Sequence, residues 1–224
     1  MSPADSAPRA FGGVIFLPFA PTLPRASCFI DGQNLYFAAR EAFGYDVPDY
    51  EPVALTQRVC RQRGWALGSI HFYTGIPSAI DSPHWHDYWT AKLGAMGHRG
   101  IHTCSRPLSY QQSILRLPDG ETRSVRIGRE KGIDVRIALD IVRLARQQDF
   151  DVAVVFSQDQ DLGEVALEIR SIAAQQSRWI KIASAFPIGP GTKNSRGIDR
   201  TDWIRIEKDA YDTCRETTDF RRPR

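Results

Sequence analysis

Apolar residues along the chain form two patterns, short unbroken runs and longer stretches with helical spacing. The clearest run is Val152–Phe156, which ends at a polar turn that carries Asp159 and Asp161. Such a run of apolar and β-branched residues is typical of a strand buried on both faces, as in a parallel sheet. A helix pattern follows at 161–175. The turn is therefore expected at the carboxyl end of a strand, where open α/β sheets bind ligands.

The same alternation of strand and helix patterns extends from residue 27 to residue 206. We expect further strands at 27–31, 67–74, 101–105, 179–184 and 203–206, and further helices at 34–43, 53–62, 84–96 and 131–146. This order is typical of a doubly wound α/β fold with a mainly parallel sheet. A β-hairpin is expected over 114–127, with its turn at Pro118-Asp119-Gly120.

The two ends of the chain differ in composition from the rest. Residues 1–25 are rich in Pro, Ala and Ser and are interpreted as a leader, residues 26–208 as one domain, and residues 209–224 as a charged tail that frays. The apolar run at 11–20 has the character of a weak signal segment. Pro18, two glycines and Asp5 argue against that interpretation. The alternatives are a leader packed on the surface, or a start of translation assigned too far upstream.

Composition limits the class of protein. The 224 residues are 42% hydrophobic and 25% charged, as in a soluble domain of ordinary size, and the net charge of +3 does not by itself indicate a nucleic-acid partner. Four scattered cysteines without a C-x-x-C pair fit free thiols in a reducing, cytoplasmic compartment. No apolar run approaches the roughly 18–20 residues of a membrane span, so no membrane partner is expected.

The basic residues are concentrated around the predicted hairpin. They are Arg106, Arg116, Arg123, Arg126, Arg129 and Lys131. This cluster has two interpretations, a solvated hairpin face or, beside an acidic metal site, a surface that positions phosphates. The aromatic residues Trp85, Tyr88 and Trp89 are more typical of a core or an interface than of a base-stacking platform. A homodimer through them or through the leader stays open.

Acidic residues follow two of the expected strands. Asp31 ends the first strand, and Asp159 and Asp161 follow the fourth. Asp31 alone would be interpreted as a helix N-cap. If these strands are neighbours, the carboxylates converge, and oxygen ligands without His or Cys select Mg²⁺ or Mn²⁺. Such ions stabilise charge on a phosphodiester and activate water. No phosphate-binding Gly-rich Lys loop or nucleophile elbow is present, which disfavours an NTPase or a serine hydrolase.

Two acids on the long helix at 131–146 have different expected roles. Asp134 lies on the apolar stripe, one turn before Ile137, where a carboxylate is costly unless it faces a cleft. Asp140 lies four residues after Arg136 and three before Arg143, so a surface ion pair is expected there.

Three short segments resemble the signature blocks of the NYN-domain family, relatives of the PIN-like nucleases that include bacterial LabA-like proteins. The segments are Phe29-Ile-Asp-Gly-Gln-Asn-Leu35, Lys131-Gly-Ile-Asp-Val135 and Ser157-Gln-Asp-Gln-Asp-Leu162. Their order and spacing match, and the resemblance covers residues 27–206. It implies a PIN-like three-layer α/β/α fold, elaborated by the hairpin, and metal-dependent ribonuclease chemistry. One departure is Gln158, where the family often has Gly or Asp.

The resemblance also implies roles for individual residues. Asp31, Asp134 and Asp159 would hold Mg²⁺ or Mn²⁺, and Asp161 would be a further ligand or would orient the attacking water. Asn34 and Ser157 would hydrogen-bond ligands or substrate. The expected contacts to the RNA backbone are Lys131, Arg126, Arg129 and Arg196.

Two other functions stay open. A domain of this fold can bind RNA or scaffold a regulatory complex without cutting, although the four acids favour an enzyme. A metal-dependent phosphohydrolase acting on a small phosphate ester is the second alternative, and the basic hairpin argues against it. Binding of a polyanion weakens steeply with salt, whereas binding of a small ester does not.

Overall fold

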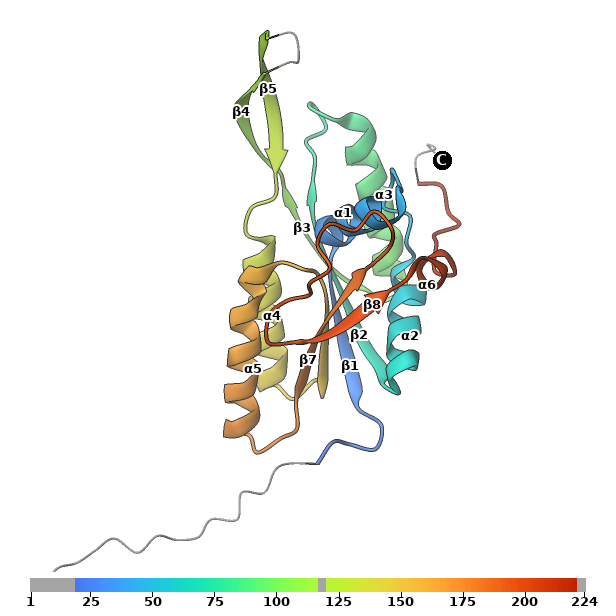
Figure 1. The fold of residues 1–224 in the computed structure, drawn as a ribbon, viewed down its shortest axis with the longest axis vertical. Helices are drawn as coiled ribbons and strands as arrows, with labels where there is room; N and C mark the ends of the chain where they lie inside the picture. The colour runs from blue at the N-terminus through green and yellow to red at the C-terminus, as the bar shows by residue number, and fades with distance from the viewer. Residues whose placement is uncertain (1–18, 117–119, 221–224) are drawn as a thin grey trace, which may run out of the picture.

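The computed structural model describes residues 19–116 and 120–220, which form three layers around one sheet (Figure 1). The sheet has six strands in the order β3-β2-β1-β6-β7-β8, and all neighbours are parallel. The strands are β1 (Arg25–Asp31), β2 (Ala66–Ile76), β3 (His102–Pro107), β6 (Val152–Phe156), β7 (Lys181–Pro187) and β8 (Asp202–Ile206). This arrangement confirms the predicted α/β/α fold with a mainly parallel sheet.

Helices cover both faces of the sheet (Figure 1). One face is covered by α4 (Ile133–Arg146) and α5 (Gly163–Gln175), and the other by α1 (Gly32–Phe43), α2 (Pro52–Arg63), α3 (Pro83–His98) and the short α6 (Lys208–Asp212). A single 3₁₀ turn, η1 (Gln160–Leu162), precedes α5. The domain therefore has two hydrophobic cores, one on each side of the sheet.

Successive residues of the central strands enter opposite cores, which explains their unbroken apolar runs. In β1, Ile30 packs toward α1, α2 and α3, whereas Phe29 packs toward α4 and α5. In β6, Val154 likewise packs on the side of α1, α2 and α3, and Val155 on the side of α4 and α5. Side chains alternate along a strand, so a strand buried on both faces needs apolar residues at every position.

The order of strands reverses between β1 and β6. The chain continues from β1 to β2 and β3 on one side, and from β6 to β7 and β8 on the other. Ile30 pairs with Phe156, so the residues that follow these two strands meet at the carboxyl edge of the sheet. Such a switch point is where open α/β sheets bind ligands.

An antiparallel hairpin projects beyond this edge (Figure 1). It consists of β4 (Ser109–Arg116) and β5 (Thr122–Arg129), so the predicted range 114–127 was too short. The added positions are mostly polar and lack the alternation that marks a strand in a sequence. Of the predicted turn, Pro118 and Asp119 lie outside the described residues.

The base of the hairpin is fastened to the loop between β2 and α3. The Ser78 amide donates to the Tyr110 hydroxyl at 2.9 Å. The Arg126 guanidinium pairs with Asp81 at 2.9 Å and lies 4.8 Å from the centre of the Tyr110 ring. Arg126, which we expected to contact RNA, is thus already engaged in holding the hairpin.

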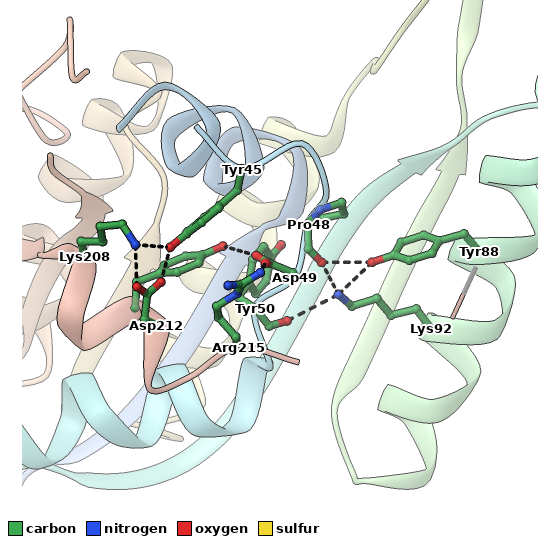
Figure 2. A network of polar contacts seen from close by, with 10 residues as sticks. Tyr45, Pro48, Asp49, Tyr50, Tyr88, Lys92, Lys208, Asp212 and Arg215 are labelled. Carbon is green, nitrogen blue, oxygen red and sulfur yellow. Dashed lines mark hydrogen bonds and ion pairs between the residues drawn. The ribbon is translucent and has the colours of Figure 1, made fainter. Parts of the chain in front are cut away.

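The segment after β8 packs on the domain, and our expectation that it frays from Asp209 is wrong for residues 209–220. Tyr211 and Cys214 are buried, and the Arg215 guanidinium donates to Asp49 at 2.7 Å (Figure 2). Fraying was inferred from the density of charge in this segment. These charges are used in ion pairs instead. Residues 221–224 lie outside the described chain.

Asp140 makes the ion pairs that we expected, but it is not on the surface. It pairs with Arg136 at 2.9 Å and Arg143 at 3.1 Å, and its carboxylate also accepts the Tyr73 hydroxyl at 3.0 Å. The residue is only 5% exposed, because β2 brings Tyr73 over it. Asp140 therefore joins α4 to the sheet.

The start of the described chain leads directly into β1. Phe19 and Leu23 are exposed, and the part of the predicted apolar leader before Phe19 lies outside the described residues. Within the described residues, no helix combines the length and the apolarity that crossing a membrane requires.

A buried lysine on α3 joins this helix to the loop before α2. Lys92 is 1% exposed, and its ammonium donates to the carbonyl oxygens of Pro48 and Tyr50 and to the Tyr88 hydroxyl (Figure 2). The rings of Tyr50, Tyr88 and Trp89 lie within 6.0 Å of it. Burial lowers the pKa of Lys92 to about 8, and nearby carboxylates oppose this shift.

We expect the stability of the wild type to rise relative to Lys92→Met between about pH 8 and pH 10. In this interval the folded state has released the Lys92 proton while the unfolded state keeps it, so raising the pH favours folding. The gain in the free energy of unfolding should be about 2 kcal/mol. Urea denaturation of both proteins across this range measures it. Parallel pH profiles would contradict the assignment.

Candidate active site

An open cavity of about 450 Å³ lies at the carboxyl ends of β1 and β6, at the switch point of the sheet. Its lining residues are Asp31, Gln33, Asn34, Phe37, Glu130, Lys131, Gly132, Ile133, Asp134 and Asp159. Four of them are acidic, and we call this cavity the acidic cleft. It lies where the polar residues after the two central strands were expected to meet.

Asp31 both caps α1 and lines the acidic cleft. Its Oδ1 accepts a hydrogen bond from the backbone N–H of Asn34 at 3.0 Å, so the N-cap interpretation is confirmed. The residue is 6% exposed. The cap leaves further lone pairs on the carboxylate, so capping does not exclude a role in the cleft.

The turn after β6 holds Asp159 in place. Its amide donates to the Ser157 hydroxyl at 3.1 Å, and its Oδ1 accepts the Asp161 amide proton at 3.0 Å. Ser157 is 1% exposed and its carbonyl accepts the Ser184 hydroxyl at 2.7 Å. Asn34 Oδ1 accepts the Gln158 amide proton at 3.0 Å, which ties this turn to the start of α1.

Two glutamines connect the same turn to the loop between β7 and β8. The side chain of Gln158 donates to the carbonyls of Asn194 and Arg196 at 2.8 and 2.7 Å. Gln160 donates to the Gly197 carbonyl at 3.0 Å and accepts the Asp199 amide proton at 3.1 Å. The residue that departs from the family pattern, Gln158, thus fastens a loop over the turn that carries Asp159.

Asp134 enters the acidic cleft from the first turn of α4. The preceding N-cap is Gly132, with φ +73°, which has no side chain to cap the first amides of the helix. A Cβ at Gly132 would lie 2.6 Å from the Arg106 guanidinium, which places this cation over the helix start. A helix N-terminus beside two cations, Arg106 and Lys131, favours an anionic group.

Glu130 is a member of the cleft that the sequence analysis missed. Its carboxylate accepts the backbone amide of Gly75 at the end of β2. A Cβ on Gly75 would meet Glu130 at 2.6 Å, so only glycine leaves room for this contact. In the sequence, Glu130 lies between Arg129 and Lys131, and no local pattern reveals its burial.

The carboxylates of the acidic cleft destabilise one another's charged forms. Burial raises the pKa of Asp31 to about 6, and the charges of Asp159 and Asp134 add to the rise. Burial likewise raises the pKa of Glu130 to about 7, with smaller contributions from Asp31 and Asp134. Hydrogen bonds from backbone amides oppose both shifts without cancelling them. A bound cation would remove this cost.

The predicted site residues fall into two groups. Asp31, Asn34, Lys131, Asp134 and Asp159 line the acidic cleft together. Among the described residues, those predicted for the site but outside its lining are Asp161, Ser157, Arg126, Arg129 and Arg196. Asp161 is exposed beside the Asp159 turn, and Arg196 pairs with Asp199 at 2.9 Å. Their predicted roles at the site stay predictions.

The donor set of the acidic cleft fits a hard divalent cation. All its acidic ligands are carboxylate oxygens, which suit Mg²⁺ and Mn²⁺. Within residues 19–116 and 120–220, no three His, Cys, Asp or Glu side chains are close enough to hold one ion together. Mg²⁺ is usually bound through one or two carboxylates and keeps several waters, so a pair such as Asp31 and Asp159 suffices.

A parallel sheet between two helical layers, with aspartates gathered at its switch point, is the arrangement of a PIN-like fold. The family model described as the NYN domain matches residues 25–175, more than half of the chain, and the chain belongs to this family. NYN domains are PIN-like nucleases, and such nucleases typically use divalent metal ions.

A solved structure supports the fold. A protein of unknown function from Vibrio parahaemolyticus is 18% identical with a TM-score of 0.51, and the match covers 85% of this chain and 98% of that one. A ribokinase from Giardia lamblia is 12% identical over 77% of this chain and 50% of its own, and its TM-score of 0.34 is too low to carry an argument. No curated protein matches the chain.

Proposed function

We propose that this protein is a divalent-metal-dependent ribonuclease that hydrolyses RNA phosphodiester bonds in the acidic cleft. The observation that carries the proposal is the convergence of Asp31, Asp134, Asp159 and Glu130 in one cavity at the switch point of the sheet. Buried carboxylates whose pKa values are raised toward neutrality require a cation for full ionisation. Perturbed carboxyl groups gathered in one cleft are the pattern by which functional sites are recognised.

In this proposal the cleft holds Mg²⁺ or Mn²⁺, which when bound stabilises charge on the phosphodiester and lowers the pKa of a bound water. Asp31, Asp134 and Asp159 would hold the ion, partly through water, and Asp161 would be a further ligand or would orient the attacking water. Asn34 positions Asp159 indirectly, because its side chain accepts a hydrogen bond from the backbone of the turn that carries Asp159. Glu130, with a pKa of about 7, is suited to exchange a proton near neutral pH.

An RNA strand is the substrate that best fits the charges around the cleft. Lys131 lines it and Arg106 lies over the start of α4, so one phosphate would meet both cations and the first amides of that helix. Arg129 follows along the hairpin, and Arg126 and Arg196 would have to exchange their ion pairs with Asp81 and Asp199 for contacts to phosphate. Cations spread along an extended path suit a polymer of phosphates more than a single small ester.

The test is cleavage of single-stranded and structured RNAs by the wild type with Mn²⁺, with Mg²⁺ and with EDTA. Asp134→Asn is the test variant, because its side chain lines the cleft without capping a helix. Glu168→Gln is the matched control, because Glu168 is only partly buried, lies away from the cleft and pairs with Arg146 at the far end of α4. We expect cleavage that requires the metal, persists in the control and is lost in Asp134→Asn.

Two results would overturn this function. Salt-sensitive RNA binding without cleavage, equal in wild type and Asp134→Asn, would identify a binding or scaffold module of the same fold. Hydrolysis of a small aryl phosphate without RNA cleavage, at a rate insensitive to salt, would identify a phosphohydrolase.

A further inference from the structure

A second cavity, of about 300 Å³, lies beside the acidic cleft and has a different character. Its walls carry four aromatic rings, Tyr36 and Phe37 from α1 and Trp85 and Trp89 from α3. Phe37 is 50% exposed, so its ring is accessible from the solvent. Trp89 is packed in the core, as expected, whereas Trp85 is only partly buried. We call this cavity the aromatic cavity.

The aromatic cavity adjoins the acidic cleft. Gln33 and Phe37 line both cavities. Elsewhere the two are separated by a wall of two residues in contact, Gly75 facing the aromatic cavity and Glu130 facing the cleft. A ligand whose anionic group lies among the acids and cations of the cleft can therefore place a neighbouring group between the rings.

We propose that the aromatic cavity receives one unpaired nucleobase of the RNA strand whose phosphate lies in the acidic cleft. This inference rests on the proposed function. A nucleobase has flat π-faces and a polar edge, and this cavity offers aromatic rings together with the Gln33 amide, which both donates and accepts hydrogen bonds. A base and its own phosphate are linked through one sugar, which matches two cavities that share a wall.

The aromatic cavity excludes a base that is paired. Bases in a duplex are stacked on both faces and hydrogen-bonded along their edges, so a base must leave the helix before aromatic side chains can stack on it. The structure therefore assigns a preference for single strands, loops or bulges over continuous duplex. Stacking is tolerant of base identity, because every base has a π-face. Any discrimination among bases falls to polar contacts such as those of Gln33.

The experiment measures binding of a short single-stranded oligoribonucleotide in EDTA, where no cleavage occurs. The variants are Phe37→Ala, which removes an exposed ring, and Phe37→Trp, which restores one. Trp179→Leu is the control, because Trp179 is a partly buried tryptophan just before β7. It lies at the amino ends of the strands, opposite the carboxyl ends where the two cavities are. We expect Phe37→Ala to weaken binding by about tenfold and the other two variants to bind as the wild type does.

A series of oligonucleotides with one abasic position, moved along the strand, tests the occupant directly. For the wild type, removing the base at one position should weaken binding about tenfold. For Phe37→Ala, removing the same base should cause no further loss, because the contact between that base and the Phe37 ring is already absent. Equal effects of the abasic series on both proteins would overturn the inference. If metal-dependent cleavage then persists, the proposed function stands alone. If the wild type neither binds nor cuts RNA, both fail.

Discussion

Replacing Asp31 with asparagine is expected to lower metal-dependent RNA cleavage by at least about a hundredfold and to raise the thermal stability of the metal-free protein at neutral pH. Asparagine caps a helix as well as aspartate does, so the bond from the Asn34 amide is kept. What is lost is a buried negative charge, whose pKa is raised mainly by burial and further by the charges of Asp159 and Asp134. Function and stability therefore change in opposite directions.

Asp140→Asn is the matched control for this prediction. Asp140 is also buried, but it is paired with Arg136 and Arg143, which together with the Tyr73 hydroxyl lower its pKa against the effect of burial. This variant should lose about 1–2 kcal/mol of stability and keep its cleavage activity. Melting curves in EDTA and cleavage rates with Mn²⁺ measure both properties. An Asp31→Asn protein that cuts RNA at the wild-type rate would remove Asp31 from the mechanism.

The sheet and its two central aspartates could be predicted because the signal for them is local. β1 and β6 are buried on both faces, and the resulting apolar runs end at Asp31 and just before Asp159. Once these strands are neighbours, the carboxylates must approach each other. Asp134 was found by a different signal, an acid on the apolar stripe of a helix that begins at the same edge.

Features that depend on packing between distant segments could not be predicted. The hairpin is longer than its apolar part because backbone pairing continues through polar residues. The segment after Asp209 is ordered by a buried tyrosine and by an ion pair to Asp49, neither of which its charge density suggests. Glu130 belongs to the cleft only because Gly75 lets it approach the end of β2.

The second prediction with a large effect concerns the stability of the metal-free protein. It should fall as the pH rises from about 4 to about 7. The folded state holds protons on Asp31 and Glu130 up to about pH 6 and 7, respectively, whereas the unfolded state releases them near pH 4. Because the folded state binds more protons in this interval, raising the pH favours unfolding. The loss in the free energy of unfolding should be on the order of 5 kcal/mol, about half of it from each carboxyl group.

Comparison with the double variant Asp31→Asn/Glu130→Gln isolates this effect from every other titrating group. The amide of Gln keeps an oxygen that can accept the Gly75 proton, so the wall of the cleft is preserved. In EDTA the wild type should lose stability relative to the double variant as the pH rises. Millimolar Mn²⁺ or Mg²⁺ at neutral pH should restore the wild type, since an ion that binds only the folded state stabilises it. Equal slopes for the two proteins, with no effect of metal on either, would show that these carboxyls do not form a cation site.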